Sequence, residues 1–297
     1  MKTTLLADLW LIGWFDVRES LRSRRALTLA GLYLLGSTLA AYLFVSAVHA
    51  VEAQLAASIP ANSALSAELA LGLARSEGYR KVLHLLTFGD SRKADYLASL
   101  PPMGLFVTLA MMTMIPWLVA LTASDQVAGD LHLRTVRFVA LRASRSAFVL
   151  GKLLSQVLLV AAVTIGAFFP ALLLGAKDLQ SFDVGATLRF LAATAPSLLA
   201  YAFAFLGLTS LASQLCSTPG RARALTILLF ALLWLAGLPE PGTESALGVL
   251  AYLSPWQLKM GFFAPDAAQR WLTLAWAVAY GAAFTALGYL VFRRRDL

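Results

Sequence analysis

Residues 125–152 read DQVAGDLHLRTVRFVALRASRSAFVLGK, a polar stretch between two apolar runs that are each long enough to cross a bilayer. The stretch carries five cations, Arg134, Arg137, Arg142, Arg145 and Lys152, against two acids, Asp125 and Asp130. An excess of Arg and Lys in a short segment between spans is typical of a cytoplasmic loop. The stretch therefore predicts which side of a membrane is the inside.

The composition of the whole chain also indicates a membrane protein. Of its 297 residues, 59% are hydrophobic and 13% are charged, whereas a soluble domain carries about a quarter charged residues. The net charge of +8 comes from cations at the ends of apolar runs and not from a continuous basic stripe, so we predict no nucleic-acid partner. The single Cys216 excludes a Cys-based metal site, and His49 and His84 have no third ligand at metal spacing, so we predict no metal site.

Six apolar runs predict an all-α polytopic protein with a single transmembrane domain over residues 1–297. The predicted spans are residues 26–48, 104–122, 153–175, 188–211, 224–238 and 271–292. The fifth run would reach only about 22 Å as a helix, short of the roughly 30 Å bilayer core. The breaker Pro239-Glu240-Pro241-Gly242 and a second short apolar piece follow it. We therefore predict an outer re-entrant region over residues 239–268.

Residues 1–25 form an amphipathic pattern ahead of the first span. One side has apolar residues at helical spacing, Leu6, Trp10, Trp14, Val17 and Leu21, and the other side is mostly charged. This predicts an elbow helix that lies in the inner membrane interface, in contact with lipid. An ordinary cytoplasmic leader is the alternative. A signal peptide cleaved after Ala50 is disfavoured, because the apolar run before it is longer than a typical signal core.

The distribution of charge predicts six spans with both termini in the cytoplasm. With that topology, fifteen of the 24 Lys and Arg residues lie inside, as the positive-inside rule requires. Residues 50–102 then form a large extracytoplasmic loop, which is a candidate contact for a periplasmic partner. We predict a multi-pass protein of the bacterial inner membrane.

The segment 125–145 is predicted to lie flat under the bilayer. Leu131, Val136, Val139 and Leu141 alternate with Arg134, Arg137 and Arg142, so one face of a helix would be apolar and the other cationic. Such a face suits docking to a partner. A solvated basic loop with no partner is the alternative.

The order of residues in this segment resembles that of a known transporter family. Asp125, Gly129, Leu131, Ser144, Arg145, Gly151 and Lys152 match a pattern of an acid, a glycine, a short apolar stretch, a Ser-Arg turn and Gly-Lys. This pattern is similar to that of the permease subunits of type V ABC exporters, the ABC type-2 permeases. The stretch ESLRSRR at residues 19–25 and the tail FRRRDL at residues 292–297 add to the resemblance. Asp130 and Arg142 depart from it, since the family usually has Thr and Pro there.

The resemblance implies a docking role and a set of partners. The residues expected to contact an ATPase are Asp125, Gly129, Asp130, Leu131, Arg134, Arg137, Arg142, Ser144 and Arg145. The expected partners are two copies of a cytoplasmic ABC ATPase, which would bind ATP and Mg²⁺, and a second copy of the permease in a homodimer. The chain itself is expected to need no cofactor. Small residues on two spans, Gly31 with Gly36 and Ala277 with Gly281, either contact the second copy or pack the monomer.

The spans lack the chemistry of a pump or an enzyme. Their cores contain no ionisable side chain to bind a coupling ion, and Lys152 and Arg189, near span ends, are expected to snorkel to the interface. Gly151-Lys152 lacks the upstream glycine of a phosphate-binding loop, so the chain is predicted not to hydrolyse ATP itself. Energy is therefore expected to come from a separate subunit.

Three functional hypotheses remain open at this point. The first is a permease that exports a substrate or transmits force to an outer partner. The second is a membrane scaffold or assembly factor without transport activity. The third is an intramembrane enzyme, which would require polar residues such as Ser155, Gln156, Thr164 and Ser197 to converge in the fold. The sequence does not identify a substrate-binding residue.

Overall fold

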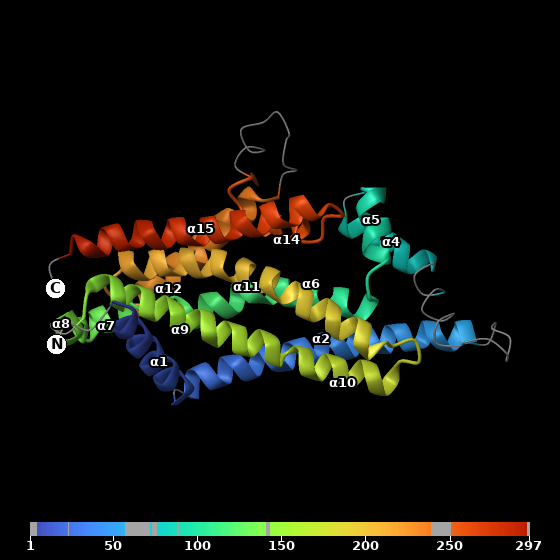
Figure 1. The fold of residues 1–297 in the computed structure, drawn as a ribbon, viewed down its shortest axis with the longest axis horizontal. Coiled ribbons are helices and arrows are strands. Elements are labelled where there is room, and N and C mark those ends of the chain that lie inside the picture. The colour runs from blue at the N-terminus through green and yellow to red at the C-terminus, as the bar shows by residue number, and fades with distance from the viewer. Residues whose placement is uncertain are drawn as a thin grey trace.

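The computed structural model describes residues 5–22, 24–56, 72, 76–87, 89–140, 143–238 and 251–295. Regular structure within these residues is entirely helical. Six helical segments among them are long and apolar enough to cross a membrane, and they lie side by side in one bundle (Figure 1). The predicted all-α polytopic fold with six spans is therefore confirmed.

The elements follow one another in this order: α1 (Leu5–Arg22), α2 (Arg24–Ala56), α4 (Glu77–Leu86), α5 (Ser91–Ala98), α6 (Pro102–Ala123), α7 (Ala128–His132), α8 (Val136–Ala140), α9 (Arg145–Gly166), α10 (Phe168–Asp178), α11 (Val184–Leu215), α12 (Pro219–Ala236), η1 (Pro255–Gln257), α14 (Leu258–Gly261) and α15 (Ala267–Arg293). Most spanning helices extend several residues beyond the predicted apolar runs. Polar residues at the ends of a span do not stop a helix, because they reach water or a partner.

The third span is built from two helices, α9 and α10. Pro170 is the third residue of α10 and has no N–H group to donate to the carbonyl of Gly166, where α9 ends. Pro116 and Pro196 lie inside α6 and α11 without interrupting them. A proline therefore divides one span of this bundle and is accommodated within two others.

The tightest helix crossing in the core joins α11 to α15. A Cβ atom added to Gly281 would lie 2.5 Å from the carbonyl oxygen of Phe203, and one added to Gly207 would overlap the backbone of Gly281. Ala277 and Thr285, on the same side of α15, are buried. Ala277 and Gly281 of the last span therefore pack within the monomer, which is one of the two roles predicted for them. Gly31 has an open surface around it.

Residues from distant parts of the chain meet at the end of the bundle that carries α4 and α5. The buried carboxylate of Glu52 accepts hydrogen bonds from the backbone N–H groups of Gln180 and Ser181, at 3.1 and 3.0 Å. Arg80 of α4 pairs with Asp95 of α5 at 2.8 Å. The described part of the predicted large loop therefore contains α4 and α5. Residues 57–71 and 73–75 of that loop lie outside the described residues.

The segment before α15 packs back on the bundle. The ring of Trp256 lies 4.6 Å from that of Phe205 and 5.8 Å from that of Phe230, and Gln257 donates to the carbonyl of Gly237 at 2.6 Å. Residues 239–250 of the predicted re-entrant region lie outside the described residues, so re-entry stays a prediction.

The start of α1, the helices α7 and α8 and the end of α15 share one end of the bundle, opposite α4 and α5 (Figure 1). We call it the α7 end. An even number of spans returns the chain to the side where it began, so this arrangement fits the predicted topology. Which side of the membrane the α7 end faces is still given by the positive-inside rule alone.

We expect Gly281→Ala to destabilise the bundle, because its methyl group has no room against the backbone of Phe203. Overpacking of this kind costs about 1–3 kcal/mol. Thermal unfolding of the purified protein in detergent measures the effect, with Gly31→Ala as the matched control in a glycine position that has open space. Equal melting temperatures for the two variants would contradict the crossing.

Candidate functional site

Two glycines bring α1 against α9 at the α7 end. A Cβ atom on Gly151 would lie 2.9 Å from the side chain of Ile12 and 3.1 Å from the carbonyl oxygen of Leu9. A Cβ atom on Gly13 would lie 3.1 Å from the carbonyl oxygen of Gly151. Any larger residue would separate the helices. The glycine of the Gly-Lys pair is thus needed for this close approach.

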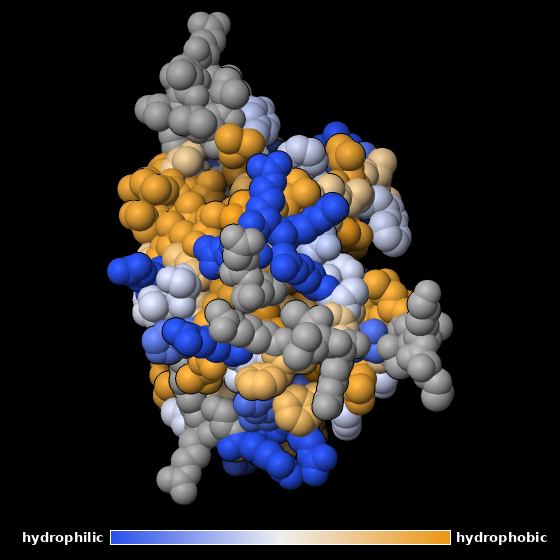
Figure 2. Space-filling view, turned by 90° about the vertical axis from the view of Figure 1, so that its left-hand side faces the viewer, coloured by the Kyte–Doolittle hydropathy of each residue, from blue (hydrophilic) through white to orange (hydrophobic). Residues whose placement is uncertain are grey.

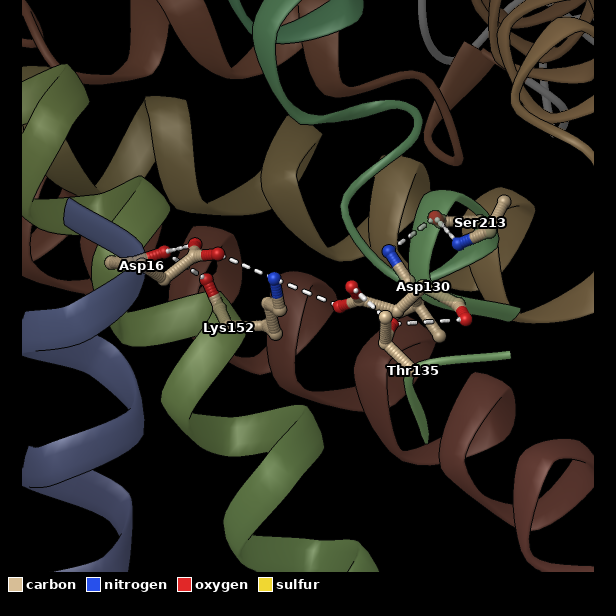
Figure 3. A network of polar contacts seen from close by, with 8 residues as sticks. Asp16, Asp130, Thr135, Lys152 and Ser213 are labelled. Atoms are coloured by element: carbon tan, nitrogen blue, oxygen red, sulfur yellow. Dashed lines mark hydrogen bonds and ion pairs between the residues drawn. The ribbon is translucent and has the colours of Figure 1, made fainter. Parts of the chain in front are cut away.

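The lysine of the same pair joins three helices. The ammonium group of Lys152 on α9 forms an ion pair with Asp16 of α1 and another with Asp130 of α7, the latter at 2.9 Å (Figure 3). The hydroxyl of Ser155 donates to the other oxygen of Asp16. The side chain of Lys152 is only 12% exposed. One buried cation therefore links two carboxylates that come from opposite sides of α9.

This network corrects two expectations. Lys152 does not snorkel to the interface, because its ammonium group is held between Asp16 and Asp130. Val17 does not share the outer apolar face of α1 with Trp10 and Trp14, since it is buried while both Trp side chains are exposed. The face of α1 that meets α9 contains Gly13, Asp16 and Val17.

The segment after α6 is two short helices and not one flat helix. Residues 133–135 form a turn between α7 and α8, where Arg134 adopts a left-handed conformation with φ of 58°. The hydroxyl of Thr135 donates to the carboxylate of Asp130 at 2.9 Å and so fixes the turn. Asp130, a departure from the family pattern, thus holds both the turn and Lys152.

Two further contacts anchor the start of α7. The hydroxyl of Ser213 on α11 accepts hydrogen bonds from the backbone N–H groups of Val127 and Ala128, at 2.9 and 3.0 Å (Figure 3). Asp125 forms an ion pair with Arg223 of α12 at 2.8 Å. A helix begins with N–H groups that lack partners within it, so Ser213 supplies what α7 needs at this point.

Arginines close the ends of two helices nearby. Arg145 donates to the carbonyl oxygens of Arg293 and Arg295, at 2.6 and 3.0 Å, and Arg295 donates to those of Leu215 and Cys216. Carbonyl groups at the C-terminus of a helix lack partners and carry partial negative charge, which a guanidinium group satisfies. The tail of the chain is thereby fastened to α9 and α11.

The structure places the predicted contact residues in different surroundings. Asp125, Asp130, Ser144 and Arg145 bind within the chain, with Ser144 accepting from the N–H group of Ala147 at 3.1 Å at the start of α9. Leu131 packs on a small core that includes Val127, Val136, Phe148 and Phe292. Gly129 and Arg134 lie toward the surface. The side chain of Arg137 and the whole of Arg142 lie outside the described residues.

Large apolar side chains stand beside Arg134 on this surface. Leu133 is 71% exposed and Phe138 is 73% exposed. We call Leu133, Arg134 and Phe138 the exposed turn. The surface at the α7 end mixes hydrophilic and hydrophobic side chains (Figure 2). Such a mixture of a cation and large apolar groups is typical of a protein contact surface.

Sequence reasoning missed the contacts that Asp16, Ser213 and Arg295 make at this end. The signal for Asp16 is that Asp16 and Val17 lie three and four residues after Gly13, so the three share one face of a helix. Ser213 and Arg295 give no local signal, because a serine within a span and an arginine after one are both ordinary.

Six spans and a polar segment anchored between two of them define a polytopic membrane protein. The chain belongs to the family described as ABC-2 family transporter proteins, whose sequence profile matches residues 10–297. It is thus a permease component of an ABC transporter, and members of this family are membrane components that are not catalytic themselves. No curated protein matches the chain.

We expect Lys152→Met to be strongly destabilising, because it leaves Asp16 and Asp130 buried without a cation. Removing one partner of a buried ion pair typically costs about 3–5 kcal/mol. The control is Arg189→Met, since the exposed Arg189 donates to the carbonyl of Gly185 within its own helix. Unfolding in detergent measures both variants, and a loss for Arg189→Met as large as for Lys152→Met would refute the network.

Proposed function

We propose that this permease couples ATP hydrolysis by a separate cytoplasmic ABC ATPase to the export of a substrate or to the movement of an extracytoplasmic partner. The observation that carries the proposal is the exposed turn, Leu133, Arg134 and Phe138, presented on a segment whose other side is bonded to the bundle. Membership of the ABC-2 family supports an ABC ATPase as the partner.

The bonds beneath the exposed turn would carry movement into the spans. Asp130 connects α7 to Lys152 on α9 and through it to Asp16 on α1, while Ser213 and Arg223 connect the same segment to α11 and α12. A force applied to the turn would thus act on four helices at once. Coupling through a contiguous network of ion pairs and hydrogen bonds is a physical route between a docking site and distant spans.

The bonds within the chain divide the expected contact residues between two proposed roles. Asp125, Asp130 and Arg145 would serve to hold the docking segment, since their side chains bind within the chain. Arg134 would meet the ATPase, because its guanidinium fork suits carboxylates and carbonyl groups of a partner groove. Leu133 and Phe138 would add apolar contact around it.

The assembly that we propose contains two permease copies and two ATPases. Two ATPases that close around two nucleotides need two docking segments, one from each permease copy. The open surface around Gly31 on α2 leaves a close-packing face available for the second copy. Gly207 of α11 and Gly281 of α15 are already used within the monomer.

We expect the α7 end to face the cytoplasm. Single cysteines at His132 and at Ser91, both exposed and at opposite ends of the bundle, are introduced into a Cys216→Ala background. A membrane-impermeant maleimide applied to intact cells should label Ser91→Cys and not His132→Cys. Labelling of His132→Cys alone would reverse the orientation and remove the docking proposal.

We expect the double variant Arg134→Ala with Phe138→Ala to lose ATPase binding while the permease stays folded, because neither side chain is buried. Loss of a charged contact at a partly buried interface costs about 2–5 kcal/mol. Co-purification with a co-expressed partner ABC ATPase measures binding, and the native mass of the wild-type complex tests the proposed two-plus-two composition.

The matched control for this experiment is Arg294→Ala, which removes an exposed cation from the same end of the bundle. Arg145→Ala is unsuitable as a docking variant, since it also releases the carbonyl groups of the tail. If the double variant retains the ATPase and Arg294→Ala loses it, the tail and not the exposed turn is the docking surface.

A further inference from the structure

A cavity of about 320 Å³ lies at the α7 end between α1, α2, α6, α7 and α9. Its wall toward the middle of the spans is apolar and includes Leu27, Leu118 and Val163. Its polar wall includes Asp16, Asp130 and Lys152, which Figure 3 shows together. The volume and the mixture of an apolar wall with a few polar groups are typical of a small-molecule site.

Two amides in the wall of the cavity have no hydrogen-bond partner among the described residues. Gln126 is 8% exposed and lacks a partner for both its Oε1 and its Nε2 atom. Gln156 is 4% exposed and lacks a partner for Oε1. Buried polar groups are nearly always bonded, so two unpartnered amides that line one cavity indicate a ligand or solvent that bonds to them there.

The charges around the cavity favour a cation. Asp125 in its wall pairs with Arg223 and has further interactions, so it is left out of the balance; the other described charges of the wall are Asp16, Glu19 and Asp130 against Lys152. Among the side chains that the structure describes there, the balance is negative. An anionic headgroup would be repelled, whereas an ammonium group would be attracted.

The bonding groups agree with the charge. The Oε1 atoms of Gln126 and Gln156 are acceptors, and an ammonium group or an amine supplies N–H donors or a positive charge for them. The apolar wall suits an alkyl or aryl tail. Leu21 and Leu27, each 53% exposed, lie in the wall and bring it to the outer surface of the bundle, so a tail can enter from the membrane side.

We propose that this cavity binds an amphiphilic cation, with its ammonium headgroup at Gln126, Gln156 and Glu19 and its tail against the apolar wall. The ligand class is defined by its headgroup, and its source is either a free amphiphilic cation or a lipid with an ammonium headgroup. Binding requires no ATPase, so the inference stands or falls separately from the proposed coupling.

Binding of tritiated decyltrimethylammonium to the full-length purified permease in maltoside detergent tests the proposal by scintillation proximity. We expect saturable binding that unlabelled decyltrimethylammonium displaces and decanoate does not. Displacement by dihexanoyl phosphatidylethanolamine at similar concentration would assign the site to a lipid, and absence of that displacement would assign it to a free cation. Displacement by decanoate as effective as by the cation would overturn the proposal.

The variant that identifies the site is Gln126→Leu with Gln156→Leu. We expect the affinity for the probe to fall at least about tenfold, because the cation loses the partial negative charge of two amide oxygens in the wall. The melting temperature without ligand should stay unchanged or rise, since both polar atoms of the Gln126 amide and Oε1 of Gln156 have no hydrogen-bond partner among the described residues. Unchanged affinity, whether or not the melting temperature falls, would show that these amides are structural only.

A second pair of variants tests the charge. Glu19→Gln should weaken probe binding severalfold without unfolding the chain, because Glu19 is exposed on the rim of the cavity. Asp8→Asn on the same helix is the control, since Asp8 does not line the cavity, and it should bind the probe like the wild type. Equal weakening by both variants would mean that the probe senses only the overall charge of α1, which would overturn the assigned site.

Discussion

The interaction on which the rest of the α7 end depends is the ammonium group of Lys152 between the carboxylates of Asp16 and Asp130. Three charges withdrawn from water are tolerable only when each has its partner at bonding distance. Gly151 supplies the geometry, because it lets the backbone of α1 approach α9 closely enough for Asp16 to reach the lysine. Gly151 and Lys152 therefore act together, because the glycine allows α1 to approach α9 and the lysine then reaches Asp16.

With this network in place, two sets of residues in the polar segment have different roles. The acids and hydroxyls on its inner side, such as Asp130 and Thr135, fix its position, and Leu133, Arg134 and Phe138 remain free for contact on the outer side. A docking surface that must pass movement to the spans needs both properties. The same acids form part of the cavity wall, so occupation of the cavity and the position of the docking segment would be linked through shared side chains.

The spans were predictable because hydrophobic length is a property of each stretch of sequence by itself. The role of Arg145 was not, since its guanidinium group satisfies the carbonyls of Arg293 and Arg295 and is not simply presented to a partner. Val17 was placed on the wrong face of α1 because hydrophobic periodicity does not distinguish a lipid-facing side from one packed on a helix. In both cases a second element of the fold contacts the side chain.

The sequence by itself determined the class of the protein and its six spans, because apolar run length, charge excess and motif order are local. Only the tertiary structure decided which charges pair and where a cavity remains. Asp16 and Lys152 are separated by 136 residues, and no local pattern specifies which distant acid reaches a given lysine. That choice is made by helix crossing, which follows from the close approach at Gly13 and Gly151.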